Sequence, residues 1–223
     1  MKRLRFISFV AFATLILSAV GCGTADTTTA PSFITVEDGK FMRNGEPYYF
    51  VGTNFWYGAI LGSEGEGGNR ERLHKELDFM KAHGIDNLRI LVGGEGENGL
   101  LGKIEPNLQP LPGEYNDEVL AGLDYLMMEL GKRDMTAVLY FNNAWEWSGG
   151  YTQYVAWANE TPVLVPRVDG WFSYNTFAGE FVRNQRAMEI FYDHVRFIVS
   201  RTNRYTGIKY VDDPAIFSWQ ISN

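Results

Sequence analysis

Asn87-Leu-Arg-Ile-Leu-Val92 is a short apolar run in which Arg89 is the one charged residue, and Gly93-Gly94 follows it at once. Such a run, bounded by turn residues, is typical of a buried strand. Residues 116–133 come next with apolar side chains at helical spacing, and residues 136–140 form another apolar run. A helix between two buried strands predicts a right-handed βαβ unit and therefore a parallel sheet.

The same alternation extends along the chain in both directions. Residues 46–54 predict an earlier strand, residues 69–83 an earlier helix, residues 181–201 a later helix and residues 215–220 a fourth strand. Long loops follow the strands, among them an aromatic-rich loop over residues 141–176, and no glycine fingerprint opens the first helix. Because function in (β/α)8 barrels lies on the βα loops, this pattern favours such a barrel over a Rossmann fold.

The strand count indicates only part of that barrel. A (β/α)8 barrel has eight strands and about 250 residues, whereas this chain of 223 residues supplies four strands and stops directly after the last. We therefore expect an α/β TIM barrel of which the chain holds about the first four strands, as an N-terminal fragment. Asp38-Gly39 and Asn44-Gly45 separate short β-prone runs before the first core strand, which predicts a small β-hairpin there.

The N-terminus has the pattern of an export signal. Residues 1–22 begin with basic residues, continue with an apolar run over residues 6–20, and end in small residues before Cys22. This resembles a bacterial lipoprotein signal, in which Cys22 would be lipidated; ordinary cleavage nearby is the alternative. Both readings predict an exported protein, either secreted or lipid-anchored to a bacterial membrane at the periplasm or cell surface. Residues 23–32 are predicted to be a flexible tether and residues 33–223 the N-terminal half of the barrel.

Composition excludes several classes of function. Apolar residues make up 45% of the chain, which excludes intrinsic disorder. Without residues 1–22 and their three basic side chains, 17 basic residues face 27 acidic ones, a formal charge of −10 that argues against a nucleic-acid partner. The single cysteine and three scattered histidines predict neither an internal disulfide nor a metal site.

Two segments suggest sugar binding. Residues 140–150 read Tyr-Phe-Asn-Asn-Ala-Trp-Glu-Trp-Ser-Gly-Gly, and residues 54–57 read Asn-Phe-Trp-Tyr. Flat aromatic rings and amides suit sugar rings, which have an apolar face edged by hydroxyls. The alternative is that some rings pack beneath the loops, and for Trp56 and Trp147 we leave the two readings open. The candidate substrate-binding residues are Asn54, Trp56, Asn142, Asn143, Trp145 and Trp147.

Charged and titratable residues give further expectations. Arg89 lies inside an apolar strand, so it needs a carboxylate partner or a water-filled pocket at the strand's end; a structural ion pair is the alternative. Glu95 lies in a glycine-rich loop with no visible partner and is not expected to be catalytic. The three histidines are expected on the outer faces of helices.

Four segments together resemble a known family: residues 54–57, 87–89, 141–157 and 214–223 occur in the order found in the endo-β-1,4-mannanases of glycoside hydrolase family 5. The resemblance covers residues 33–223, and the Asn-Asn-x-Trp-x-x-x-Gly-Gly loop is its more mannanase-like element. It implies a retaining hydrolase on a TIM barrel that needs no metal or cofactor and cuts internal linkages of mannan, glucomannan or galactomannan.

The resemblance also implies roles for single residues. Asn223 matches the asparagine before the acid/base glutamate, and Arg89 matches the arginine that keeps the nucleophilic glutamate ionised. Asn142, Asn143 and Trp145 match the loop that lines the substrate cleft. Both catalytic glutamates would lie beyond this chain, so we expect the chain alone to be inactive and the protein to be a monomer. A β-1,4-glucanase on the same scaffold and a non-catalytic glycan-binding lipoprotein are the alternatives.

Overall fold

The computed structural model describes residues 32–100 and 102–223. The predicted signal peptide with Cys22, and the tether up to residue 31, lie outside the described residues. Within the described ranges, no helix combines the length and the apolar character of a membrane-spanning segment.

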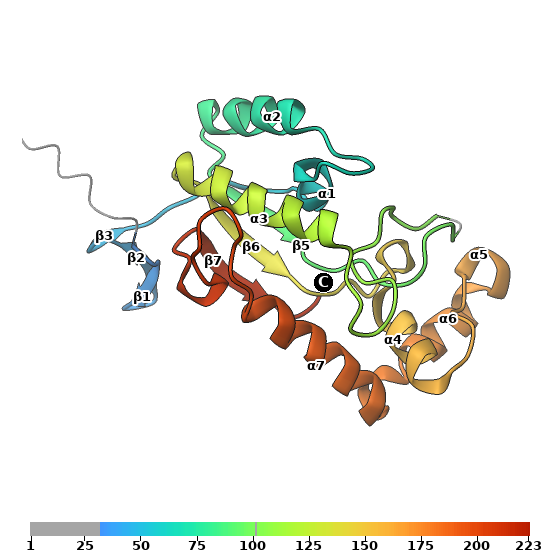
Figure 1. Ribbon diagram of the computed structural model, residues 1–223. Helices are drawn as coiled ribbons and strands as arrows, with labels where there is room; N and C mark the ends of the chain where they lie inside the picture. Colours follow the sequence, from blue (N-terminus) through green and yellow to red (C-terminus); the bar gives the residue numbers. More distant parts are fainter. Residues whose placement is uncertain (1–31, 101) are drawn as a thin grey trace, which may run out of the picture. The chain divides into compact units, whose positions relative to one another are not determined.

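The core of the structure is a four-stranded parallel sheet in the order β4-β5-β6-β7 (Figure 1). Its strands are β4 (Gly52–Asn54), β5 (Asn87–Leu91), β6 (Thr136–Tyr140) and β7 (Ile216–Gln220). The register aligns Asn54 with Arg89, Arg89 with Val138 and Val138 with Ser218. Strands β5, β6 and β7 match the predicted apolar runs. Of the strand predicted over residues 46–54, only Gly52–Asn54 pairs in this sheet, because Glu46–Pro47 pair with an earlier strand.

A long helix lies between each pair of consecutive strands: α2 (Arg70–Ala82) precedes β5, α3 (Asp117–Lys132) precedes β6 and α7 (Gln185–Val199) precedes β7. Each begins after an asparagine whose side-chain oxygen accepts hydrogen bonds from the first turn: Asn69, Asn116 and Asn184. The Asn184 cap explains why α7 starts at Gln185, later than the predicted helix over residues 181–201; Phe181–Arg183 instead form the 3-10 turn η2. A short helix, α1 (Gly58–Gly62), was not predicted.

The predicted hairpin before the barrel is confirmed and has a third strand. Strands β1 (Thr35–Glu37), β2 (Lys40–Arg43) and β3 (Glu46–Pro47) pair antiparallel. Both connecting turns have positive φ at each central residue, as the Asp-Gly and Asn-Gly pairs require. The Tyr48 hydroxyl lies 3.2 Å from Thr136 Oγ1 at the amino end of β6, so the segment after β3 contacts the amino-terminal side of the parallel sheet.

The aromatic-rich segment is not the loop that residues 141–176 were predicted to form. It contains the 3-10 turn η1 (Glu146–Ser148) and the helices α4 (Gly150–Asn159), α5 (Pro166–Asp169) and α6 (Trp171–Ala178). Figure 1 shows these helices past the carboxyl ends of β5 and β6. Tyr154 of α4 is fully buried and its ring packs on Phe181 and Phe191, so this ring belongs to the core.

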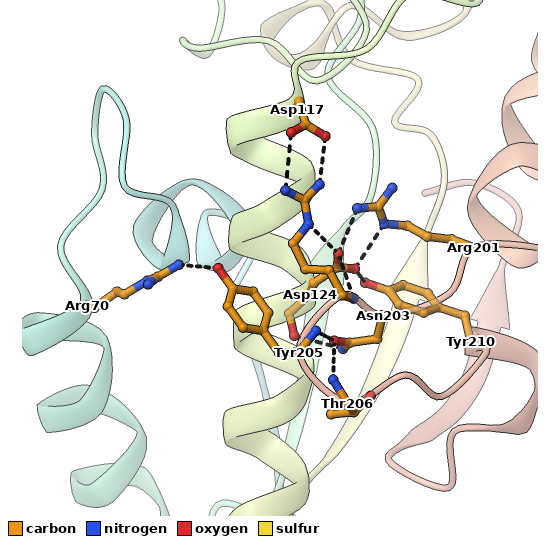
Figure 2. Close-up of polar contacts among 9 residues, drawn as sticks. Arg70, Asp117, Asp124, Arg201, Asn203, Tyr205, Thr206 and Tyr210 are labelled. Atoms are coloured by element: carbon orange, nitrogen blue, oxygen red, sulfur yellow. Dashed lines mark hydrogen bonds and ion pairs between the residues drawn. The ribbon is translucent and has the colours of Figure 1, made fainter.

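A buried carboxylate joins α3 to the connection between α7 and β7, which includes the 3-10 turn η3 (Tyr210–Asp212). Asp124 is fully buried and accepts two hydrogen bonds from the Arg201 guanidinium, at 2.9 and 2.7 Å (Figure 2). Arg204 Nε donates to it at 3.1 Å and the Tyr210 hydroxyl at 2.7 Å. The charge of Asp124 is thereby compensated where no water reaches it.

One histidine contradicts the sequence-based expectation. His194 of α7 is fully buried rather than on an outer face: its Nε2 lies 2.8 Å from the carbonyl oxygen of Val92, and its ring stacks on Tyr115. Burial lowers the pKa of His194 to about 4, so the ring is neutral at physiological pH.

Candidate active site

Arg89, in the middle of β5, is the centre of the polar groups at the carboxyl side of the sheet. Its Nε donates to Gln220 Oε1 at 2.8 Å, Nη1 to Asn54 Oδ1 at 3.4 Å, and Nη2 to Asn223 Oδ1 at 3.2 Å. The guanidinium lies 3.8 Å from the centroid of the Tyr140 ring, in cation–π contact. Parallel pairing of β4, β5, β6 and β7 brings these residues to one place.

The contacts of Arg89 leave part of its hydrogen-bonding capacity unused. Throughout residues 32–100 and 102–223, no carboxylate lies within ion-pair distance of it, so the alternative of a structural ion pair within this part of the chain is wrong. A guanidinium has five N–H donors, and three of Arg89's hydrogen bonds are to neutral amide oxygens. The arginine is therefore fixed in place, and no carboxylate among the described residues compensates its charge.

Asn223 connects Arg89 to the loop after β6. Its backbone N–H donates to the Asn142 carbonyl at 3.0 Å, and its Nδ2 donates to Asn143 Oδ1 at 3.3 Å. Asn143 Oδ1 also accepts from the Trp145 backbone N–H at 3.2 Å. The structure thus brings together Asn223, Arg89, Asn54, Asn142 and Asn143, five of the residues predicted to form the site.

Asn142 and Asn143 are both buried. Neither polar side-chain atom of Asn142 has a hydrogen-bond partner within the described ranges, and neither does Nδ2 of Asn143. Their matched role as substrate contacts stays a prediction, but Asn143 has a definite local function, because its Oδ1 fixes the backbone from which Trp145 projects.

Four of the six tryptophans form two pairs. Trp145 is 53% exposed and meets Trp171 of α6, 47% exposed, at 5.9 Å between ring centroids. Trp56 is 38% exposed and meets the half-buried Trp147 edge-on at 5.2 Å. Trp171 was not predicted as a site residue, because residues 141–176 were interpreted as one loop and the sequence did not indicate which of its side chains lie near Trp145. Tyr154, by contrast, is buried beneath the loop and packs in the core, as the alternative to sugar binding predicts.

Glu95, for which the sequence offered no partner, joins two loops. It is 1% exposed; Oε2 accepts from the Gly150 N–H and Oε1 from the Tyr154 hydroxyl, both at 3.1 Å. Its own N–H donates to the Ser148 carbonyl at 3.0 Å, and Ile104 N–H donates to the Trp147 carbonyl at 2.7 Å. Burial raises the pKa of Glu95 to about 7 against the lowering effect of these donors. The sequence feature that could have indicated this close approach is the pair of glycines in each loop, Gly93-Gly94 and Gly149-Gly150.

No three histidine, cysteine, aspartate or glutamate side chains converge as a possible metal site in the part of the chain that the structure describes. The chemistry available here is that of a fixed cation, amides and exposed indole rings.

A parallel sheet of the TIM-barrel type, with an arginine fixed by amides at its carboxyl side and exposed tryptophans on the loops, defines the class of a glycoside hydrolase barrel. A family model described as "GH family 5 beta-mannosidase-like" matches residues 31–223, so the chain belongs to this family.

Relatives with known names agree with this assignment. Mannan endo-1,4-beta-mannosidase 7 of Arabidopsis thaliana is 28% identical over 225 residues, covering 100% of this chain and 47% of the relative. A crystal structure of a glycoside hydrolase family 5 mannosidase from Rhizomucor miehei, in complex with mannosyl-fructose, is 37% identical with a TM-score of 0.82, over 86% of this chain and 48% of that one. The endo-1,4-beta-mannanase of the same organism is 25% identical with a TM-score of 0.64, over 86% of this chain and 48% of its own.

The chain spans about half the length of the curated relatives it matches. The structural neighbours are family 5 TIM barrels. The predicted fold, a TIM barrel of which this chain holds only a part, is confirmed.

Proposed function

We propose that the protein containing this chain is a retaining endo-β-1,4-mannanase acting on mannan, glucomannan or galactomannan. The observation that carries the proposal is Arg89, whose guanidinium is held by three amide oxygens and has no carboxylate partner in the described ranges. A guanidinium fixed in this way can stabilise the ionised form of a nucleophilic carboxylate located on another strand of the complete barrel. The names of the relatives support mannan as the substrate.

Retaining hydrolysis needs two carboxyl groups about 5–5.5 Å apart. One is protonated and donates to the leaving oxygen, while the other attacks the anomeric carbon, forming a glycosyl-enzyme that water then hydrolyses. The other half of the barrel would supply both. Arg89 would keep the nucleophile ionised through its charge, and Asn223 would hydrogen-bond the 2-hydroxyl of the sugar being cleaved.

A second candidate is an exo-acting β-mannosidase. The Rhizomucor miehei mannosidase is the more similar of the two fungal structures, by both identity and TM-score. Helices α4, α5 and α6 lie past the carboxyl ends of the strands (Figure 1). Helices in this position would close one end of a substrate cleft, as an enzyme that acts on chain ends requires.

The test is hydrolysis by the full-length protein of mannan, carboxymethylcellulose and short β-1,4-manno-oligosaccharides. We expect a fast fall in the viscosity of mannan, with retention at the anomeric carbon by NMR. Release of mannose alone would favour the exo-acting candidate, and preference for carboxymethylcellulose a β-glucanase. Binding without hydrolysis of any of these would favour the glycan-binding alternative.

Replacing Trp145 by alanine is expected to weaken binding of manno-oligosaccharides. Loss of an exposed indole that stacks on a sugar should cost about 1–3 kcal/mol, and each loss of about 1.4 kcal/mol raises Kd tenfold. Calorimetric titration measures the effect, and Tyr49→Ala is the matched control, because Tyr49 is 82% exposed and lies before β4. An unchanged Kd would mean that the ring serves packing against Trp171.

We also propose that the protein is exported and anchored through a lipid on Cys22. The support is the sequence pattern of residues 1–22. Cys22→Ser is expected to move the protein from the membrane fraction to the soluble exported fraction, detected by immunoblot. Equal distribution of the two proteins would contradict the anchor.

A further inference from the structure

We propose that Glu95 is a positioning residue that holds the aromatic loop, residues 141–150, in the conformation that presents Trp145 and Trp147 to the glycan. The proposal follows from where the carboxyl group lies. It comes from the loop after β5, yet both of its oxygens accept hydrogen bonds from the segment after β6, from Gly150 and Tyr154.

Glu95 acts as the N-terminal cap of α4. That helix starts at Gly150, and its preceding residue, Gly149, offers no side chain for capping. The N–H groups of a first helical turn lack partners within the helix, so an oxygen from elsewhere in the chain can accept from them. Glu95 Oε2 fills this role at 3.1 Å from the Gly150 nitrogen, so the start of α4 is fixed by a residue 55 positions earlier.

The two glycines of the loop fit this arrangement. A Cβ atom at Gly149 would overlap the backbone oxygen of Glu95, and one at Gly150 would overlap the Asn143 carbonyl oxygen. Both also have positive φ, at 94° and 70°. The Gly-Gly pair therefore permits the loop to lie directly on Glu95 and Asn143, which fixes the backbone that leads to both tryptophans.

Titratable groups surround Glu95 on several elements. Lys103 comes from its own loop and donates to Gln153 of α4 at 3.0 Å, and burial lowers the pKa of Lys103 to about 8. Among the described residues, four tyrosines also interact electrostatically with Glu95: Tyr115, Tyr140, Tyr154 and Tyr174. Lys103 and the tyrosines keep their charge states between pH 4.5 and 7, so in this range Glu95 is the group among them whose charge changes.

The direction of the pH effect follows from linkage. The pKa of Glu95 is raised from 4.5 to about 7 while the loop is in place, and it returns to the ordinary value when the loop opens and water reaches the carboxyl group. The closed loop is therefore most stable below pH 4.5, loses stability as the pH rises to about 7, and changes little just above that.

The test compares Glu95→Ala, Glu95→Gln and the control Glu97→Gln in the full-length protein. Glu97 lies on the same loop with an exposed side chain. Hydrogen exchange of peptides from residues 141–155 is measured without substrate between pH 4.5 and 7.5. We expect the wild type and Glu97→Gln to lose protection toward pH 7. Glu95→Gln should keep protection without the pH dependence, because its amide can still accept from Gly150, and Glu95→Ala should lose protection at every pH.

Kinetics give a second readout, and this part rests on the proposed function. Glu95→Ala should raise KM for manno-oligosaccharides by about tenfold, the equivalent of one lost hydrogen bond, with a smaller change in kcat and rescue by Glu95→Gln. Wild-type exchange and KM in Glu95→Ala, or persistent pH dependence in Glu95→Gln, overturns the inference. If no mannan is hydrolysed but exchange changes as expected, the proposed function fails and the positioning role stands.

Discussion

Replacing Arg89 by alanine is expected to lower kcat on mannan by about 100-fold or more, with a much smaller change in KM. Fixed charges and donors that stabilise a reacting group contribute about 10²–10³ in kcat, and an arginine beside a carboxylate lowers its pKa by about 1–3 units. Without it, the proposed nucleophile would be protonated over a wider pH range. Steady-state kinetics of the full-length protein across pH 4–8 measure both effects.

Two companion variants make this result interpretable. Arg89→Lys keeps the charge but not the planar fork that reaches Gln220, Asn54 and Asn223 at once, so it should recover only part of the activity. Arg196→Ala removes an arginine whose side chain is 67% exposed on α7 and should leave kcat unchanged. Near-normal turnover in Arg89→Ala would contradict the role under the nucleophile.

Replacing Asp124 by alanine is expected to lower the free energy of unfolding by about 3–5 kcal/mol. The change removes the buried carboxylate that pairs with Arg201, and breaking a buried ion pair from one side costs this much. Arg204 would keep its exposed partner Asp117, whereas Tyr210 would lose the acceptor of its buried hydroxyl (Figure 2). Chemical denaturation of the full-length protein measures the loss.

Asp117→Ala is the matched control for this change, because it lies on the same helix and pairs with the same Arg204. Its side chain is 77% exposed, so its removal should cost about 1 kcal/mol or less. If both variants lose the same small amount, the connection between α7 and β7 does not depend on the buried carboxylate.

Periodicity was sufficient for the elements that bury an apolar face by themselves. The helix expected over residues 69–83 is α2, with its ends moved by one residue, because Asn69 provides a local cap and the apolar side chains recur every turn. The two central strands of the parallel sheet, β5 and β6, likewise follow from apolar runs whose side chains are mostly buried on both faces.

The missed features depend on partners far away in the sequence. Helix α4 has a glycine where a capping side chain would be expected and receives its cap from Glu95, so its local sequence resembles a loop. Arg89 was predicted to need a carboxylate partner or a water-filled pocket, but among the described residues it binds three amide oxygens. Two of these, from Gln220 and Asn223, lie more than 130 residues later, where no sequence pattern connects them to Arg89. His194 was misplaced because a buried neutral histidine needs only a carbonyl acceptor, here that of Val92.

The contact between the loops after β5 and β6 has a consequence for how this barrel can diversify. TIM-barrel enzymes commonly change specificity by altering single βα loops on an unchanged frame. Here the Glu95 and Ile104 N–H groups donate to the carbonyls of Ser148 and Trp147. The conformation of each loop therefore depends on hydrogen bonds to the other, so we expect the two loops to change together in evolution. A chimera that exchanges the segment after β6 alone should fold poorly, whereas one that transfers both loops together should keep the donor's substrate preference.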